Sequence, residues 1–498
     1  MAPCGAIFIA QYKAANSFRS GYALTMSESN STLITRDRLT YLFLGLVAWL
    51  PLPLGSKHPW AISIAETWCF LLAIFALLHF FRTPEPLPRS FRTAKIAFML
   101  LSLNLCWLLI QCLPLPISLL ELVSPHTAQL YLATGAGISS ASISVDTYAT
   151  WQDFVEAAYL MTFFALALYL FDSRDKIRWL VYTVLLSALF QAIYGGLMIL
   201  TGAEYSFFIS KAAIHSHVGS ATGTFSNRDH LAGYLEMALA LGIGYMLSML
   251  SNSLPSQNWR IRILQWSELL LGAKARLRLI LILLCLGLVL THSRGGNLGF
   301  FTSLAVAGGF FLLLARRKPR STVIFLSSLI ILDIILIGSW VGVSKVMTRL
   351  EQTSMQTESR DEAVFSTLPM LQDYWLTGSG AGTYFEMFPA YKEPGLPDYW
   401  SHAHNDYLEI LTDQGLIGFS LLAGTVVFAL FTILQALRKR RSQLMLGMSF
   451  ASLMGIVAIL IHSTVDFNLQ ILANSSLFML LLALAMICRR LQGHGSAA

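Results

Sequence analysis

The side chains best suited to chemistry occur together in one stretch, residues 401–418, which reads SHAHNDYLEILTDQGLIG. It holds two histidines, one amide and three carboxylates: His402, His404, Asn405, Asp406, Glu409 and Asp413. An imidazole with its ordinary pKa of about 6.5 can accept a proton from a hydroxyl group at neutral pH. The stretch runs directly into an apolar segment, residues 419–434. Polar groups at such a membrane boundary are costly unless they are used, so we predict a site here.

Two arginines, Arg294 and Arg360, are predicted to bring positive charge to this site. Arg294 lies in the sequence THSRGG between two apolar segments, where so tight a return favours glycine, which tolerates a positive φ angle and close backbone approach. A guanidinium binds phosphate oxygens in a bidentate manner, and at about 4 Å the pair contributes roughly 4 kcal/mol at an effective dielectric constant near 20. The alternatives are a snorkelling anchor for Arg294 and, for Arg360, pairing with neighbouring carboxylates.

Three further polar segments are predicted on the same side of the membrane. Residues 223–233 either cap the helix that follows or line the site, and residues 461–468 add His462, Asp466 and Asn468. Residues 378–384 read GSGAGTY, a turn that is only a weak indication of a phosphate cradle. The spacing of Asp406 and Glu409 is typical of a capping box, so a helix is predicted to begin near Asn405.

The elements that must position these groups are membrane helices. Of 498 residues, 55% are apolar and only 12% are charged, and the mean hydropathy is +0.61. A soluble protein has about 25% charged residues, so the composition indicates an all-α polytopic membrane protein. Twelve spans are predicted, with a large outer loop before the tenth: 40–56, 60–81, 96–115, 152–171, 177–200, 230–250, 277–292, 296–315, 322–344, 415–436, 443–462 and 470–488.

Charge predicts the orientation of these spans. Most of the 34 basic residues fall in alternate connections, and the other connections hold only Lys57, Lys211, Arg228, Arg294, Lys345, Arg349, Arg360 and Lys392. The positive-inside rule therefore puts both termini in the cytoplasm and every polar cluster described above outside it. The net charge of +7 is a topology signal and does not indicate nucleic-acid binding.

This topology divides the chain into four predicted parts. Residues 1–39 form a cytoplasmic segment without an evident signal peptide, and residues 40–200 form an N-terminal bundle of five spans. Residues 201–488 form the catalytic membrane region, with its outer loop at 345–404, and residues 489–498 form a cytoplasmic tail. The six cysteines show neither a disulfide framework nor metal-type spacing.

Arginine and histidine at an outer membrane boundary are suited to one kind of reaction. The arginines would hold a lipid-linked diphosphate and stabilise the charge that develops as it departs, and His404 would accept the proton of an attacking hydroxyl. The predicted reaction is the transfer of a group from a membrane-anchored diphosphate to an alcohol. It requires no ATP and no cofactor.

Several of these residues also carry a family resemblance. His404-Asn405, followed after nine residues by Gly415-Leu-Ile-Gly418, resembles the signature of the O-antigen ligase superfamily. Arg294-Gly-Gly-Asn-Leu298 is similar to the Arg-x-x-x-Leu element of that family, and Arg360 lies where a second arginine of the large periplasmic loop is expected. The resemblance covers roughly residues 200–490 and includes segments 223–231, 378–384 and 462–468.

The resemblance implies a twelve-span glycosyltransferase of the C superclass in the bacterial inner membrane, with its active site facing the periplasm. Such an enzyme transfers a glycan from undecaprenyl diphosphate, with inversion and without a metal. The acceptor is lipid A core for ligases, a growing glycan for O-antigen or exopolysaccharide polymerases, and a protein hydroxyl for oligosaccharyltransferases; the short C-terminal tail favours a ligase or a polymerase.

The predicted site residues fall into two groups. The catalytic ones are His404, Arg294 and Arg360, and those predicted to contact the substrate are Asn405, Asn227, Arg228, His230, His292, Tyr384, Glu409 and Asp466.

Two other classes of protein remain open from the residues alone. Acidic residues within predicted spans are typical of an ion or proton path, which suggests a transporter: Glu66, Glu156, Glu236 and Asp333. The His402-x-His404 pair, with His292, His462 and Asp466 on the same side, suggests a metal enzyme, although a single such pair is common by chance. No metal is predicted.

Overall fold

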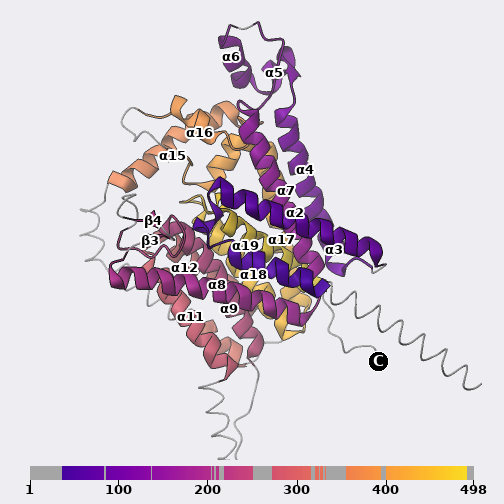
Figure 1. Cartoon of the computed structure of the whole chain (residues 1–498), viewed down its shortest axis with the longest axis vertical. Helices are drawn as coiled ribbons and strands as arrows, with labels where there is room; N and C mark the ends of the chain where they lie inside the picture. The colour runs from indigo at the N-terminus through magenta and orange to yellow at the C-terminus, as the bar shows by residue number, and fades with distance from the viewer. Residues whose placement is uncertain are drawn as a thin grey trace, which may run out of the picture.

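The structure is a computed structural model of the whole chain. It describes residues 36–83, 86–135, 137–203, 205–206, 209–211, 218–250, 272–315, 320–324, 326–328, 331, 355–393 and 400–490. The predicted cytoplasmic segment before residue 36, Asp333 and most of the tail lie outside the described residues. Within the described part the protein is a bundle of long helices (Figure 1).

Nine of the described helices are long and apolar enough to cross a membrane, which confirms a polytopic membrane protein. They are α2 (Pro59–Arg82), α4 (Lys95–Cys112), α7 (Thr147–Leu170), α8 (Arg174–Thr201), α9 (Arg228–Met249), α12 (Arg294–Leu314), α17 (Asp406–Lys439), α18 (Gln443–His462) and α19 (Leu472–Arg490). Each overlaps one of the twelve predicted spans, with ends that differ by several residues in most cases, and α18 matches its prediction to the residue.

The other three predicted spans are less complete. Residues 36–49 are helical and lead through a turn to the short 3-10 helix η1 (Leu54–Ser56), because Pro51 and Pro53 end the longer helix. Helix α11 (Ala273–Leu290) forms as predicted, but basic residues occupy its first turns. Of the ninth predicted span, only residues 322–324, 326–328 and 331 are described, and they are helical.

Smaller elements cover one end of the bundle. Helices α5 (Ile117–Val123) and α6 (Pro125–Ala133) project beyond the ends of α4 and α7, and α15 (Met355–Tyr374) and α16 (Tyr384–Met387) lie across the bundle beside them (Figure 1). The other short elements are α3 (Arg89–Thr93), η2 (Phe388–Ala390) and η3 (Asn468–Gln470).

Strands are few and short among the described residues. The strand β1 (Leu115–Pro116) pairs antiparallel with β2 (Ser140–Ala141), and β3 (Tyr205–Ser206) pairs antiparallel with β4 (Ile209–Ser210). Both pairs lie in connections between helices, so the predicted all-α class describes the bundle itself.

Helices α9, α18 and α19 form the centre of the bundle, because almost every residue of each is buried. The closest approach is between α9 and α18 at two glycines. A Cβ on Gly447 would lie 2.2 Å from the carbonyl oxygen of Gly244, and one on Gly244 would lie 2.3 Å from that of Gly447. Small residues allow this backbone contact, as is common where membrane helices pack.

The two ends of the bundle differ in charge. At one end, where α8 begins and α18 follows α17, the ion pairs Arg36–Asp172 and Lys176–Asp37 tie neighbouring segments together, and Arg440 donates to the Cys488 carbonyl. The other end holds the N-termini of α9, α12 and α17 and the C-terminus of α18, with few basic residues. All the polar segments singled out from the sequence reach this second end, which we call the polar end.

Helix α17 is interrupted where it leaves the polar end. Gly415 has a φ angle of +66°, a left-handed conformation that glycine adopts without strain. The N–H of Leu416 donates to the Trp375 carbonyl, and the Trp107 indole donates to the carbonyl of Gln414. The Gly415-x-x-Gly418 signature is therefore a break in the helix whose freed backbone groups are all bonded to neighbouring segments.

Candidate active site

His404 lies immediately before α17 in a strained conformation. Its φ angle is +50°, which is uncommon for a residue with a side chain. Its ring packs edge-to-face against Trp400 and Phe467, with centroids 5.3 and 4.8 Å away. Strain of this kind persists where the surroundings over-determine a residue, and such residues cluster at functional sites.

Helix α17 begins where the sequence predicted, but the predicted capping box of Asp406 and Glu409 does not form, because Glu409 bonds to His402 and Ala403 instead. Asn405 is the N-cap and accepts hydrogen bonds from the N–H groups of Tyr407 and Leu408. Its amide also donates to the Thr464 carbonyl, 3.0 Å away. Asn405 thus joins the histidine loop to the turn between α18 and α19.

Glu409 supports the loop from within the helix. One carboxylate oxygen lies 2.7 Å from Nδ1 of His402, and the other accepts the N–H of Ala403 at 2.9 Å. The His402 ring stacks on Phe467 at 4.2 Å. Glu409 and His402 are therefore occupied in shaping the backbone that presents His404.

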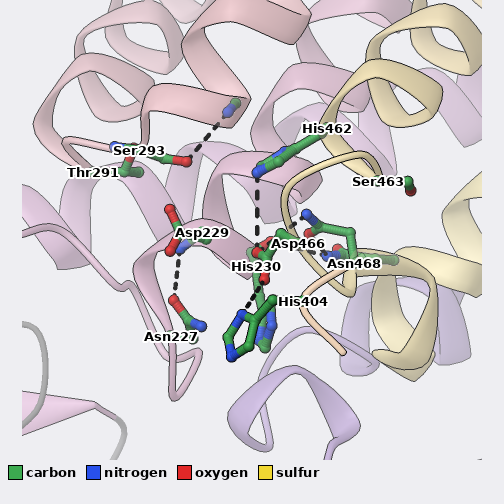
Figure 2. Close-up of polar contacts among 12 residues, drawn as sticks. Asn227, Asp229, His230, Thr291, Ser293, His404, His462, Ser463, Asp466 and Asn468 are labelled. Atoms are coloured by element: carbon green, nitrogen blue, oxygen red, sulfur yellow. Dashed lines mark hydrogen bonds and ion pairs between the residues drawn. The ribbon is translucent and has the colours of Figure 1, made fainter. Parts of the chain in front are cut away.

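Asp466, from the turn after α18, faces His404 (Figure 2). Its Oδ1 lies 3.4 Å from Nδ1 of His404, and the carboxylate is only 1% exposed. Burial alone would raise the pKa of Asp466, but the contact with His404 and the charges of His230 and His462 outweigh it and hold that pKa well below its usual range. Asp466 is thus a carboxylate placed to hold His404 through Nδ1, which leaves Nε2 as the ring nitrogen for a substrate proton.

Behind Asp466 lies a second imidazole and a second carboxylate. Nε2 of His462 is 4.0 Å from Asp466, and its Nδ1 is 3.2 Å from Oε1 of Glu236 in α9. Asn468 donates to Oδ2 of Asp466 at 3.5 Å, the same oxygen that His462 approaches, and accepts from Asn474, which also donates to the His230 carbonyl. The turn carrying Asp466 is therefore bonded to both α9 and α19.

Arg294 lies at the polar end of the bundle, as this cluster does. It is the first residue of α12, its side chain is exposed, and Ser293 caps the helix through the N–H of Gly296. A Cβ on Gly295 would lie 2.6 Å from the His462 ring and 2.8 Å from Val465. The predicted positive φ for these glycines is wrong, because His292 takes the positive φ of +54°. The predicted close approach is confirmed, since Gly295 lets α12 approach the His462 turn.

Ser220 connects two more predicted site residues to this helix end. Its hydroxyl lies 3.3 Å from a guanidinium nitrogen of Arg228 and 3.5 Å from Nδ1 of His292. The N–H of Ala221 donates to the Leu290 carbonyl, so this loop is held against the end of α11. Arg228 and His292 therefore lie next to the turn that carries Arg294.

Asn227 and His230 have structural contacts in this arrangement. Asn227 is the N-cap of α9 and accepts the N–H of Asp229, as one of the two sequence readings predicted (Figure 2). His230 is buried with its ring 4.7 Å from that of Phe467. The side chain of His230 thus lines the inner wall of the cluster.

Two predicted site residues make no described hydrogen bond or ion pair with the cluster, although Tyr384 shares a hydrophobic cluster with Ala403 and Trp400 of the histidine loop. Tyr384 is buried, stacks on Phe388 and shares a hydrogen bond with Thr367. Arg360 lies in α15, in a part of that helix where only the backbone is described. The roles of Tyr384 and Arg360 stay predictions from the resemblance.

The glycine turn at 378–383 is structural. The N–H groups of Gly378, Ser379, Gly380 and Thr383 donate to backbone carbonyls, and those of Ala381 and Gly382 donate to Gln111 and Asp413. A phosphate cradle requires free N–H groups, so this weak reading is wrong.

Sequence reasoning missed two members of the cluster. Glu236 was read as a sign of an ion path, although its carboxylate pairs with His462. Lys57, between η1 and α2, has its ammonium 5.5 Å from the Phe467 ring centre; burial lowers the pKa of Lys57, and Asp466 and Glu409 only partly oppose this. The scarcity of basic residues in outer connections was the signal that could have identified Lys57.

One group in the described part of the chain could hold a metal ion. Asp229, His462 and Asp466 each offer a ligand atom, and these atoms lie within 4.8 Å of one another. His462 and Asp466 belonged to the metal alternative drawn from the sequence, whereas His402 is engaged by Glu409.

A comparison with protein families matches residues 279–423 to the O-antigen ligase model. A comparison with curated proteins gave no match. The matched range contains Arg294, Arg360 and His404, whereas Glu236, His462 and Asp466 lie outside it. The chain is therefore a multi-pass membrane protein with an O-antigen ligase domain, and its predicted relation to the O-antigen ligase superfamily is confirmed.

Proposed function

We propose that this protein transfers a glycan from undecaprenyl diphosphate to an acceptor hydroxyl, as an O-antigen ligase acting on lipid A core or as a polymerase extending a glycan. Three observations support the proposal: the match to the O-antigen ligase family, the single polar end, and the approach of α12, at Gly295 next to Arg294, to the turn that carries Asp466. The single observation that carries it is His404, in a strained loop, held by a buried carboxylate.

The proposed step begins with the acceptor. Nε2 of His404 takes the proton of the acceptor hydroxyl, whose oxygen attacks the anomeric carbon of the glycan. The bond from that carbon to the diphosphate oxygen breaks, and undecaprenyl diphosphate departs with the electron pair. Attack on the face opposite the leaving group inverts the anomeric centre. Asp466 stabilises the imidazolium that forms, as a carboxylate does for a catalytic histidine elsewhere.

The departing diphosphate requires positive charge at the polar end. Arg294 is exposed there, and Arg228 and His292 lie against the same turn through Ser220. We assign the diphosphate to this group, with Arg360 as a further predicted contact from the outer loop. Because a diphosphate is already a good leaving group, the step needs neither ATP nor a metal, so the group Asp229, His462 and Asp466 acts here without an ion.

We place the polar end on the periplasmic side of a bacterial inner membrane. The basic residues of the described helices collect at the opposite end, where α8 begins and α17 and α19 end. An excess of lysine and arginine marks the cytoplasmic side of membrane proteins. Lipid-linked glycans destined for the cell surface would then reach His404 from the outer leaflet.

The test is glycan transfer by the purified protein in lipid, with an undecaprenyl diphosphate glycan and separately offered acceptors: lipid A core, the same glycan, and a serine- or threonine-containing protein. We expect product with one of the first two acceptors. His404→Ala and Arg294→Ala should each lower the rate by at least about 10²-fold, the usual loss when an acid–base group is removed. Asp175→Asn, which breaks an exposed pair with Arg178 at the basic end, is the matched control.

Three outcomes would contradict the proposal. Product only with the protein acceptor would make the chain an oligosaccharyltransferase. Movement of the lipid-linked glycan across the bilayer without any transfer would make it a transporter. Full activity of the His404→Ala protein would remove the assigned base.

A further inference from the structure

Asp406, the first residue of α17, has a buried side chain that the proposed transfer step does not use. Only 1% of the residue is exposed, although it lies two residues after His404 at the polar end. Asn405 provides the helix cap, so the carboxylate of Asp406 is not needed there. Burial of a polar group is costly unless hydrogen bonds compensate for it, so the partners of Asp406 indicate its role.

One carboxylate oxygen of Asp406 holds the chain on both sides of Asp466. Its Oδ2 accepts a hydrogen bond from the hydroxyl of Ser463 at 2.6 Å and another from the N–H of Leu469 at 3.2 Å. Ser463 lies three residues before Asp466, and Leu469 lies three residues after it. The N–H of Asp406 also donates to the Ser463 carbonyl at 3.0 Å. Asp406 therefore ties both ends of segment 463–469 to the start of α17.

Both neighbours of Asp406 bond to the chain that precedes Asp466. The amide of Asn405 and the hydroxyl of Tyr407 each donate to a backbone carbonyl of segment 460–464, at 3.0 and 2.6 Å. Of these three consecutive residues, Asp406 is the one that also reaches the chain after Asp466. It therefore constrains the position of Asp466 more completely than its neighbours do.

The contact that these bonds control is a long one. Nδ1 of His404 lies 3.4 Å from Oδ1 of Asp466, at the long end of the range for a hydrogen bond, so a further displacement would break it. His404 lies two residues before Asp406, and Asp466 lies in the middle of the segment that Asp406 holds. Misplacement of a reacting group by about 1 Å can lower a rate by about 10²-fold. The bonds of Asp406 therefore decide whether His404 and Asp466 can act together.

We propose that Asp406 is a positioning residue for glycan transfer, which sets the separation of His404 and Asp466 by holding segment 463–469 against the start of α17. It acts through the backbone on either side of Asp466 and takes no part in bond making. This inference rests on the proposed function for its effect on rate, whereas the hydrogen bonds of Asp406 can be tested without any substrate.

Three variants separate the bonds of Asp406, and a fourth is the control. Asp406→Ala removes both bonds to Oδ2, and Ser463→Ala removes only one of them. Asp406→Asn can keep an acceptor oxygen at Oδ2, because Oδ1 makes no hydrogen bond with the described residues and can be replaced by nitrogen. Asp146→Ala is the matched control, since the Asp146 carboxylate likewise accepts two N–H groups at a helix start, those of Tyr148 and Ala149 in α7.

The first experiment follows hydrogen exchange and needs no substrate. The full-length protein in lipid nanodiscs is transferred to heavy water and analysed by mass spectrometry. In Asp406→Ala, peptides covering residues 463–470 should exchange about tenfold faster, because the Leu469 N–H and the Ser463 hydroxyl lose their acceptor. Ser463→Ala should give a smaller increase, and Asp406→Asn and Asp146→Ala should give none in these peptides. Unchanged exchange in Asp406→Ala would overturn the proposal.

The second experiment measures kcat for glycan transfer. Asp406→Ala should lower kcat by about 10–10²-fold, Ser463→Ala by less, and Asp406→Asn by at most about threefold. Asp146→Ala should keep the normal kcat. A loss in Asp406→Asn as large as that in Asp406→Ala would overturn the proposal, because the acceptor oxygen is retained.

A double variant distinguishes positioning from general support of the fold. Once Asp466→Asn has disabled the contact with His404, Asp406→Ala has nothing left to misplace and should lower kcat further by at most about threefold. The same factor of loss in the Asp466→Asn background as in the unaltered background would mean that Asp406 only supports the fold.

The two proposals can fail separately. Absence of transfer by the unaltered protein with every acceptor would overturn the proposed function and the positioning role with it, while the exchange result would still decide whether Asp406 holds segment 463–469. Faster exchange in Asp406→Ala with a normal kcat would sink the positioning role and leave the proposed function standing.

Discussion

The central and the peripheral helices of this bundle use apolar sequence in different ways. In α9 and α19, 94% of the residues in the most apolar 18-residue stretch are buried. The corresponding share is 28% in α2 and 33% in α4, which turn most of their side chains toward lipid. The central helices nevertheless enclose charged and polar side chains, among them Glu236, His462 and Asn474. Apolar composition brings a helix into the membrane, but enclosure by other helices is what allows it to hold charge.

The largest expected effect tests the polar end of the central helices. Asp466→Asn keeps the shape of the side chain but removes the charge that holds His404, so kcat should fall by about 10²–10⁴-fold, the range for a disabled base. Initial rates of glycan transfer measure it. Asp175→Asn at the basic end should keep the normal rate, and equal rates in the two variants would mean that the position of the carboxylate is irrelevant.

The next prediction compares the effect of an added methyl group at two glycines, one closely packed and one not. Gly447→Ala would place a Cβ 2.2 Å from the carbonyl of Gly244 and should lower the free energy of unfolding by about 1–3 kcal/mol, as overpacking does. Gly309→Ala in α12 meets no atom within 4 Å and should be neutral or raise stability by up to about 1 kcal/mol. Thermal unfolding in detergent measures both, and equal losses would contradict the α9–α18 contact.

A smaller effect follows from the pKa of Asp466. Because the folded-state pKa lies below the unfolded value of about 3.9, the ionised carboxylate stabilises the fold above that pH and the stabilisation is lost as pH falls further. The difference in unfolding midpoint between the unaltered protein and Asp466→Asn should be constant above about pH 5 and shrink below about pH 4. A difference that grows as the pH falls would mean that ionisation of Asp466 destabilises the fold.

For the last intervention, removal of metal ions, we expect no change in activity. Removal of divalent ions by excess chelator should leave transfer unchanged, because the proposed step uses only side chains and a diphosphate leaving group. Loss of activity that returns with an added cation would show that Asp229, His462 and Asp466 hold a metal. Dialysed protein without chelator is the control.

Much of the bundle could be predicted from the sequence because a membrane span is a local property. Nine predicted spans correspond to helices of the expected length, and Asn405 and Asn227 cap the helices they were expected to begin. The shared location of His404, Arg294 and Asp466 also followed from topology, since charge alternation assigns every connection to one side.

The contacts inside the polar end could not be predicted in the same way. Glu236 and His462 are 226 residues apart, and nothing local indicates that these two side chains face each other. The glycines after Arg294 were interpreted as turn residues because the sequence does not show which side chains pack against them. In the structure they leave room for the His462 ring. Pairing between helices depends on rotation and depth, which apolar periodicity leaves open in helices buried on every side.

The break at Gly415 divides α17 into two segments with different structural roles. The segment before it is anchored by Glu409 to the histidine loop, and the segment after it packs against α4, α18 and α19. Because the backbone at the break is bonded to neighbouring segments, the point at which α17 enters the bundle is fixed relative to the histidine loop. The depth of the proposed reaction would therefore follow from contacts within the protein.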